Sequence, residues 1–196
     1  MILDTDVNDY DQLFEIAKDA IRCGVDIIQL RDKQGTTNSI LKFSQKIIKL
    51  TQGRIPYIIN DRADLVKMSG AVGVHLGQED VSIKMARKMV GPQAIIGASC
   101  QTWARVQNAQ REGADYIGFG SVFKTETKPE RNPMNLKLLQ KIANEVEVPV
   151  FAIGGINLEN IFQVKLMGVS RVAVCRAICE AKNRREVIKS FKKALS

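Results

Sequence analysis

Charged and polar side chains gather in the segment Gln29-Leu-Arg-Asp-Lys33, directly after a short apolar run. If this segment is an extended strand end, alternation directs the side chains of Gln29, Arg31 and Lys33 to the same side. Two cations beside an amide form a clamp that suits a diphosphate, because a guanidinium can hold two phosphate oxygens at once. Salt bridges with Asp32 at the rim explain the segment equally well when it is taken alone.

Two carboxylates follow the next two apolar runs. Asp61 comes after Tyr57-Ile-Ile-Asn60, and Asp80 comes shortly after Val74-His-Leu76. Neighbouring parallel strands end at the same rim, so both carboxylates are expected there, where they would repel each other unless a cation bridges them. Oxygen ligands near a phosphate favour Mg²⁺ over Zn²⁺. Taken alone, Asp80 is equally well explained as the N-cap of a helix that begins near Val81.

The later strand ends carry groups that suit a phosphate. Ser99 closes one apolar run, the glycine pair Gly154-Gly155 closes another, and Cys175-Arg176 closes the last. Glycines leave backbone N–H groups bare, and amides that lead into helices bind phosphates, so we expect a phosphate cradle reinforced by Arg176.

The polar segment 120–133 is broken by prolines and is typical of a mobile loop beside an active site. Its Thr125, Thr127 and Lys128 supply two hydroxyls and a cation. These groups are expected to close over a bound phosphate.

The single histidine, His75, lies within an apolar run, where a hydrogen-bonded structural role is favoured over that of a general base. No Ser-His-Asp or Cys-His pairing can be built from the spacing. Cys175 and Cys179 are four residues apart, but no further thiol or imidazole lies nearby to complete a zinc site. The four cysteines are scattered, which is typical of reduced thiols and not of a disulfide scaffold.

Short apolar runs alternate with segments of helical period along the whole chain, which indicates repeated β-α units and a parallel sheet. Eight such runs predict a TIM (β/α)8 barrel, an α/β fold, as one domain over residues 1–196. An open doubly wound sheet is the alternative, but its candidate phosphate turn at Gly118-Phe-Gly120 lacks the third glycine. Helices are expected at 9–22, 36–51, 61–69, 80–90, 101–112, 134–145, 157–167 and 177–195.

The chain has 29 basic and 21 acidic residues, a net charge of +8, which indicates anionic partners. The charge does not choose between phosphates and nucleic acid. The basic residues near the C-terminus follow the pattern of the solvated face of an amphipathic helix, which is favoured over a nucleic-acid surface, so no nucleic acid is expected. The longest uncharged apolar stretch, 148–158, is too short to cross a bilayer, so no membrane contact is expected. The first residues do not resemble a secretory signal, so the cytoplasm is the expected location, and assembly into homo-oligomers is left open.

Five segments, in order and over nearly the whole chain, resemble the thiamine phosphate synthase family: 29–33, 59–62, 73–80, 113–129 and 152–156. The resemblance implies a TIM barrel that uses Mg²⁺ to condense 4-amino-2-methyl-5-hydroxymethylpyrimidine diphosphate with 4-methyl-5-(2-phosphoethyl)thiazole or its carboxylate. Pyrophosphate is released. The implied path is dissociative, with diphosphate leaving before the thiazole nitrogen captures the pyrimidine cation.

The resemblance also implies roles for individual residues. The pyrimidine diphosphate would be bound by Gln29, Leu30, Arg31, Asp32, Lys33, Asn60, Ser99 and Lys128. The thiazole phosphate would be bound by Thr125, Glu126, Thr127, Gly154, Gly155, Cys175 and Arg176. Asp61 and Asp80 would hold Mg²⁺, and Arg31, Ser99 and Lys128 would act most directly in catalysis.

Two departures from the family pattern bear on the alternatives. After Ser99 this chain has Cys100-Gln101-Thr102, where many relatives carry a histidine that tautomerases of the family use for proton transfer. A thiazole tautomerase is therefore the weaker alternative. Cys175-Arg176 stands where Val-Ser or Ile-Ser is common, so its phosphate contact is expected to use amides and the guanidinium. A non-catalytic binding protein would instead use its basic residues through charge alone, with a steep salt dependence.

Overall fold

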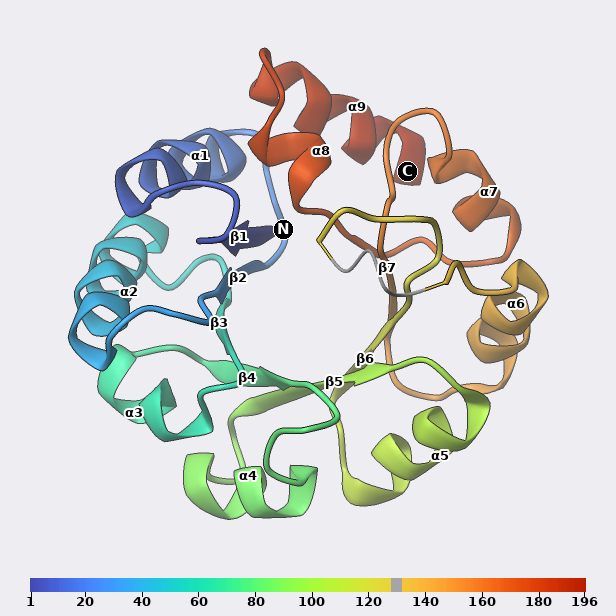
Figure 1. The fold of residues 1–196 in the computed structure, drawn as a ribbon, viewed down its shortest axis with the longest axis horizontal. Coiled ribbons are helices and arrows are strands. Elements are labelled where there is room, and N and C mark those ends of the chain that lie inside the picture. Colours follow the sequence, from blue (N-terminus) through green and yellow to red (C-terminus); the bar gives the residue numbers. More distant parts are fainter. Residues whose placement is uncertain (128–131) are drawn as a thin grey trace.

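Eight short parallel strands form a nearly closed barrel in the computed structural model, which describes residues 1–127 and 132–196 (Figure 1). Their order in the sheet follows the chain: β1 (Ile2–Asp4), β2 (Ile28–Arg31), β3 (Tyr57–Asn60), β4 (Gly73–Leu76), β5 (Ile95–Cys100), β6 (Tyr116–Phe119), β7 (Val150–Ile153) and β8 (Val172–Ala173). The backbone N–H of Ile2 donates to the carbonyl of Val174 at 2.9 Å, which joins the end of β8 to β1. The predicted TIM barrel is confirmed, and the open doubly wound alternative is wrong.

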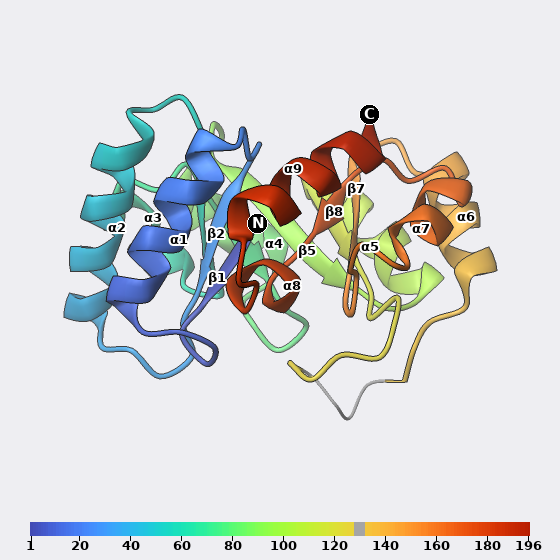
Figure 2. The ribbon, with the colours of Figure 1, turned by 90° about the horizontal axis from the view of Figure 1, so that it is seen from above.

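Helices surround the barrel as an outer ring (Figure 1). They are α1 (Tyr10–Arg22), α2 (Thr37–Thr51), α3 (Val66–Ser69), α4 (Ile83–Val90), α5 (Trp103–Glu112), α6 (Leu136–Glu145), α7 (Ile161–Leu166), α8 (Arg176–Cys179) and α9 (Arg184–Leu195), with a 3₁₀ turn η1 (Ala63–Leu65) before α3. The side view in Figure 2 shows the loop after β6 and the short helix α8 at the same end of the barrel.

Alternation along each strand separates an apolar layer from a polar interior. In β2, Ile28 and Leu30 pack between the strand and the helices, together with Leu13 of α1 and Ile40 of α2. Each of these side chains is buried almost completely, which stabilises the fold by about 1.5–3 kcal/mol per residue. The residues between them therefore face the interior of the barrel, where the charged ends of the strands can act.

Helix α4 begins three residues later than predicted. Its N-cap is Ser82, whose side chain accepts a hydrogen bond from the backbone N–H of Met85 at 3.3 Å. The alternative that Asp80 caps this helix is therefore wrong. The Asp80 carboxylate instead accepts a hydrogen bond from the backbone N–H of Gly77 at 2.6 Å, which leaves it at the rim of the barrel.

The predicted helix 61–69 begins late because Asp61 adopts a left-handed backbone with φ of 65°, which a helix cannot include. The predicted helix 157–167 is reduced to α7, since the Asn157 side chain accepts from two following amides and forms a turn. The predicted helix 177–195 is two helices. Asn183 breaks it, because its side chain accepts from the N–H of Glu186 and begins α9.

Within the described residues, no helix combines the length and the apolar character needed to cross a membrane. This finding agrees with the short apolar runs of the sequence.

Candidate functional site

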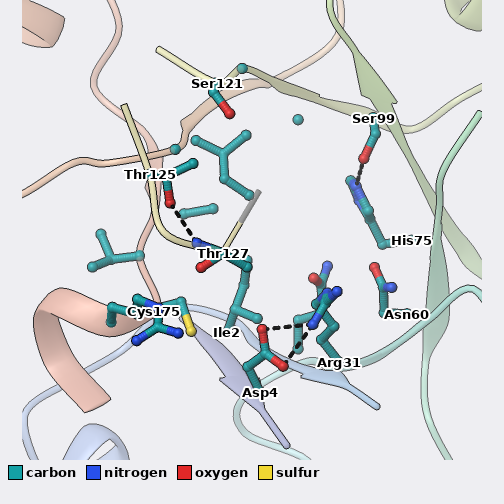
Figure 3. A pocket seen from close by; sticks show the side chains of 18 of the residues that line it. Ile2, Asp4, Arg31, Asn60, His75, Ser99, Ser121, Thr125, Thr127 and Cys175 are labelled. Atoms are coloured by element: carbon teal, nitrogen blue, oxygen red, sulfur yellow. Dashed lines mark hydrogen bonds and ion pairs between the residues drawn. The ribbon is translucent and has the colours of Figure 1, made fainter. Parts of the chain in front are cut away.

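A cavity opens at the carboxyl end of the barrel, and every one of the eight strands or its following loop contributes to its lining (Figure 3). Groups far apart in the chain meet there because parallel strands all end at one rim. The sequence-predicted residues that line it are Gln29, Arg31, Lys33, Asn60, Asp61, Ser99, Thr125, Thr127, Gly154, Gly155, Cys175 and Arg176.

Arg31 is fixed by two carboxylates. Its Nη1 donates to Oδ1 and Oδ2 of Asp4 at 2.8 and 2.9 Å, and to Oδ2 of Asp6 at 2.6 Å, as the dashed lines to Asp4 in Figure 3 indicate. Burial alone would lower the pKa of Arg31, but Asp6 and Asp4 outweigh it and raise that pKa. Asp4 is fully buried and was missed by the sequence reasoning. Its signal was its position at the carboxyl end of the first strand.

Asp61 and Asp80 meet at the rim beside Lys33. The charge of Asp61 reaches Asp80, and Lys33 Nζ forms an ion pair with Oδ2 of Asp61. A methyl group added to Gly77 would lie 3.0 Å from Oδ2 of Asp80 and 4.0 Å from Oδ1 of Asp61, so both carboxylates border the same small space. The structure thus brings together the two acids that the sequence placed on neighbouring strand ends.

The close approach of the two carboxyl groups makes the charged form of Asp80 less favourable. Burial raises the pKa of Asp80 above its ordinary 3.8, and the hydrogen bond and charge of Asp61 add to the rise, against the Gly77 N–H and the Lys33 charge. Oδ2 of Asp61 is buried, and within the described part of the chain it accepts no well-directed hydrogen bond although Lys33 lies close. A cation between the two acids would lower the pKa of Asp80 and would give Oδ2 of Asp61 a partner.

No three His, Cys, Asp or Glu side chains gather as a metal site among residues 1–127 and 132–196. A closed all-protein metal cage is therefore not built from those residues. Two adjoining carboxylates match the way Mg²⁺ is usually held, by one or two acids together with substrate phosphates and water. The donor set of Asp61 and Asp80 fits that ion.

The side chains of Leu30 in β2 and of Asp32, the residue directly after that strand, do not line the cavity. Leu30 is 1% exposed in the layer between the strand and the helices. The Asp32 carboxylate accepts from the backbone N–H groups of Gln34 and Gly35 at 3.1 and 2.6 Å and from the hydroxyl of Tyr10. Asp32 therefore shapes the loop that follows β2 and carries Lys33.

A polar network crosses the interior of the barrel below the cavity. His75 bridges the hydroxyls of Tyr116 and Ser99. Its Nδ1 lies 2.9 Å from Tyr116, and its Nε2 lies 2.8 Å from Ser99, as Figure 3 shows. Burial raises the pKa of Tyr116, and Gln29 opposes this rise. The expectation that His75 is buried and hydrogen-bonded is confirmed. The network fixes the Ser99 hydroxyl at the cavity floor, and Tyr116 was the member that sequence reasoning missed.

The glycine pair after β7 lies against the loop that follows β6. Gly154 and Gly155 have φ of 101° and 63°, a region that only glycine adopts easily. A Cβ on Gly154 would lie 2.6 Å from Cα of Ser121, and one on Gly155 would lie 2.2 Å from the carbonyl oxygen of Lys124. The first part of the loop is also tied to β7, since the N–H of Val122 donates to the carbonyl of Ile153 at 2.9 Å.

Arg176 stands at the start of α8, across the cavity from the carboxyl pair. Its Nη1 pairs with Glu180 and lies 3.5 Å from Oε2 of Glu126, whose side chain is largely exposed. Its Nε is buried and donates no hydrogen bond to any described residue. An anion at the cavity mouth would satisfy that donor. Thr125 and Thr127 lie beside it, and Oγ1 of Thr125 accepts from the N–H of Thr127 at 3.3 Å.

The predicted catalytic residue Lys128 lies outside the residues that the structure describes. The rest of the predicted diphosphate clamp, apart from Leu30 and Asp32, faces the cavity. The arrangement offers a cationic and acidic rim at one side and a glycine and arginine cradle at the other. Such a site can bind two phosphorylated groups at once.

Comparison with known proteins agrees with this geometry. The family model described as "Thiamine monophosphate synthase" matches residues 1–178. The thiamine-phosphate synthase of Methanobrevibacter smithii is 38% identical over 189 residues, which cover 94% of this chain and 90% of that protein. The enzyme of the same name from Fusobacterium nucleatum is 36% identical over 92% of this chain and 88% of its own length.

Solved structures show the same likeness. Thiamine phosphate pyrophosphorylase from Pyrococcus furiosus superposes with a TM-score of 0.90 at 33% identity, over 99% of this chain and 93% of that one. A 3-hexulose-6-phosphate synthase superposes with a TM-score of 0.71 at 17% identity, over 95% of each chain, which shows a shared fold alone.

Proposed function

The chain belongs to the thiamine monophosphate synthase family, and from this premise we propose how its cavity produces thiamine phosphate. The protein is an enzyme, a transferase of thiamine biosynthesis that acts on small phosphorylated substrates. The observation that carries the proposed mechanism is the meeting of Asp61 and Asp80 beside the basic lining of the cavity.

The pyrimidine diphosphate binds at the side of the cavity formed by β2 and β3. Gln29, Arg31, Lys33 and Asn60 hold the diphosphate oxygens, and all four line the cavity. Arg31 presents a guanidinium whose position is set by Asp4, so little side-chain entropy is lost when the diphosphate binds. Leu30 and Asp32 contribute indirectly, through the packing of β2 and the shape of its loop. Lys128 is proposed to complete the clamp from the loop after β6.

Asp61 and Asp80 would hold Mg²⁺, which would supply positive charge beside the diphosphate. The proposal is supported by the small space that both acids border, by the raised pKa of Asp80 and by the unsatisfied Oδ2 of Asp61. When bound, the ion neutralises charge on the departing diphosphate. Lys33 forms an ion pair with Asp61 and lines the cavity, so it is proposed to contact the diphosphate from the same position.

The thiazole phosphate binds at the opposite side of the cavity. Its phosphate lies among Thr125, Thr127, the amides of Gly154 and Gly155, and the Cys175-Arg176 turn, and the unpaired Nε of Arg176 supports this assignment. Glu126 reaches the same guanidinium and is proposed to be displaced by the phosphate. Ser99 holds the pyrimidine between the two charged ends, with its hydroxyl fixed by His75.

The transfer is proposed to be dissociative. The cationic clamp stabilises the diphosphate as the bond to the pyrimidine methylene breaks, and the thiazole nitrogen then captures the resulting cation. The residues of the cavity keep the two rings face to face and exclude water, which would otherwise trap the cation. No strong general base is needed, which agrees with a histidine that is already hydrogen-bonded on both sides.

Turnover by carboxylate variants tests the mechanism. Purified protein is given both substrates with and without Mg²⁺, and thiamine phosphate is measured after oxidation to its fluorescent product. Asp61→Ala should lower kcat/KM by about 100-fold, because the leaving charge is no longer neutralised. Asp64→Ala is the matched control, since Asp64 lies three residues away and pairs with Arg62 at the surface. Near-normal turnover by Asp61→Ala would contradict the metal assignment.

The alternatives are weaker. The thiazole tautomerase would need a proton-transfer group near Gln101, and it gives no role to the pairing of Asp61 with Asp80. A non-catalytic binding protein is wrong, because the relatives that cover most of the chain are thiamine-phosphate synthases. We also propose that the enzyme works in the cytoplasm, which its four free cysteines support.

A further inference from the structure

Two thiols adjoin each other at the edge of the proposed thiazole phosphate cradle. Cys175 lines the cavity and precedes α8, and Cys179 is the last residue of that helix. The backbone N–H of Cys179 donates to the carbonyl of Cys175 at 3.0 Å, so the two residues stand one helical turn apart on the same side. Each thiol shifts the pKa of the other, as expected for neighbouring groups.

We propose that Cys175 and Cys179 form a redox-sensitive pair, a site at which a hydroperoxide produces a reversible disulfide that impairs thiazole phosphate binding. Four residues of a helix advance about 6 Å, which lies within the roughly 4.4–6.8 Å that separates the Cα atoms of natural disulfides. The backbone hydrogen bond between the two residues already places them at this spacing, so joining them requires movement of their side chains and not of the barrel.

The environment distinguishes the two thiols. Cys175 is partly exposed to the cavity (Figure 3), whereas Cys179 is 3% exposed and its Sγ lies 3.7 Å from the carbonyl oxygen of Ile2. The hydrogen bond from Cys175 lowers the pKa of Cys179, against the effect of burial. The same pairing and burial raise the pKa of Cys175. Cys179 is therefore the partner that more readily becomes the nucleophilic thiolate, and Cys175 is the thiol beside it that lines the cavity.

The chemistry balances with hydrogen peroxide as the oxidant. The Cys179 thiolate attacks one peroxide oxygen, the O–O bond breaks, and the products are a sulfenic acid on Cys179 and one water, formed when the leaving hydroxide takes up a proton. The Cys175 sulfur then attacks the sulfenic sulfur, the S–O bond breaks, and the leaving hydroxide takes the Cys175 proton and departs as a second water. The two sulfurs are oxidised, the peroxide is reduced, and a dithiol reductant reverses the change.

The effect on activity rests on the proposed function, because Cys175 and Arg176 are assigned there to the phosphate cradle. A disulfide draws the Cys175 side chain toward α8 and fixes the turn that carries Arg176. The KM for the thiazole phosphate should then rise by about tenfold, the effect of losing one charge-assisted hydrogen bond. The KM for the pyrimidine diphosphate should change little, since its clamp lies on β2 and β3.

Peptide mapping tests the disulfide without reference to activity. The protein is treated with hydrogen peroxide, the remaining thiols are alkylated, and trypsin is added. Arg176 lies between the two cysteines, so trypsin separates them into peptides 172–176 and 177–182, which only a disulfide keeps together. We expect the linked pair in oxidised wild type and its loss after a dithiol reductant. Separate alkylated or overoxidised peptides, with no linked pair, would overturn the proposal.

Variants connect the modification to its effect. Cys179→Ala should keep its activity after peroxide treatment, and Cys179→Ser serves if the alanine variant melts early. Cys23→Ser is the matched control, because Cys23 is also partly exposed but contacts a carbonyl oxygen, that of Arg185, at 3.7 Å. That variant should still lose affinity on oxidation. A linked peptide with an unchanged KM would uphold the redox pair and contradict the assignment of Cys175 to the cradle.

Discussion

The charge balance around Arg31 explains how a buried cation can remain ready for a ligand. Its guanidinium is only 15% exposed, and Asp4 beside it is 1% exposed, so neither charge is well hydrated. Such a pair is tolerated because each group satisfies the other, and removal of one partner leaves the other uncompensated. Asp4 therefore sets the orientation of Arg31 before any substrate arrives.

Asp4→Asn tests this role. The variant should unfold with a free energy lower by about 2 kcal/mol, since Arg31 loses a buried carboxylate but keeps Asp6. Urea denaturation monitored by circular dichroism measures the change. Asp6→Asn is the control, because Asp6 is 41% exposed and its loss should cost about 0.5 kcal/mol. Equal losses in the two variants would contradict a special role for Asp4.

For individual residues, the sequence predicted most of the side chains that lie at the strand ends, but not all of them. Alternation correctly directed Gln29, Arg31 and Lys33 into the cavity. The same rule directs the side chain of Leu30, which the family resemblance had included, into the layer between the strand and the helices. Asp4 was missed because β1 is only three residues long and gives almost no periodic signal.

The loop after β6 and the turn after β7 act as one element. Gly154 and Gly155 let the two segments approach to a distance that no side chain allows, and backbone hydrogen bonds from Val122 and Phe123 hold them together. The position of Thr125 and Thr127 at the cavity therefore depends on glycines about thirty residues later in the chain. The sequence predicts a phosphate site at the Gly154-Gly155 pair. The structure adds that the pair also allows the two segments to pack closely.

Gly154→Ala measures this close approach. The substitution strains a left-handed residue by about 1–2 kcal/mol and also forces the new Cβ against Ser121, so a further loss of about 1–3 kcal/mol is expected. Gly91→Ala is a matched control, because Gly91 has a similar φ of 98° and open space where its Cβ would lie. Thermal melts of both variants distinguish the cost of backbone strain from the cost of steric overlap between the new Cβ and Ser121. A Gly91→Ala loss as large as that of Gly154→Ala would contradict the account.

Element boundaries were predicted less well than element order. The repeat of apolar runs placed all eight strands, since strand burial gives a strong pattern. The starts of α4 and α7 and the break between α8 and α9 depend instead on single side chains that bond to the backbone, such as Ser82 and Asn183. These local hydrogen bonds compete with the helix and leave little trace in hydrophobic periodicity.

At the scale of the whole molecule, contacts between the first and last helices join the two ends of the barrel. Helices α1 and α9 are neighbours in Figure 1, and Asp19 of α1 accepts from Nε of Arg185 at 2.6 Å. Arg184 Nε lies 3.5 Å from the second oxygen of the same carboxylate. The ion pair thus supports the junction where β8 meets β1.

This junction should depend on pH. Burial alone would raise the pKa of Asp19, but Arg185 and Arg184 outweigh it and lower that pKa below 3.8. A lowered carboxyl pKa means stability that is present above pH 3.8 and is lost as pH falls through the lower value in the folded protein. Asp19→Asn should therefore cost about 1 kcal/mol or less at pH 7, and the difference from wild type should vanish under acid conditions.

Urea melts of wild type and Asp19→Asn across pH 3 to 7 measure this difference. Asp26→Asn is the control, since Asp26 pairs with Lys192 of α9 but is 79% exposed. A difference between wild type and Asp19→Asn that grows as the pH falls would contradict the assigned sign.

The central claim is that Asp61 and Asp80 together hold a divalent cation at the rim of the barrel. Electron paramagnetic resonance of Mn²⁺, which replaces Mg²⁺ at oxygen sites, measures binding directly in the purified protein. Wild type and the Asp64→Asn control should bind one ion per chain, and Asp61→Asn and Asp80→Asn should each bind at least about tenfold more weakly. Equal binding by all four proteins would show that the two acids do not form the site.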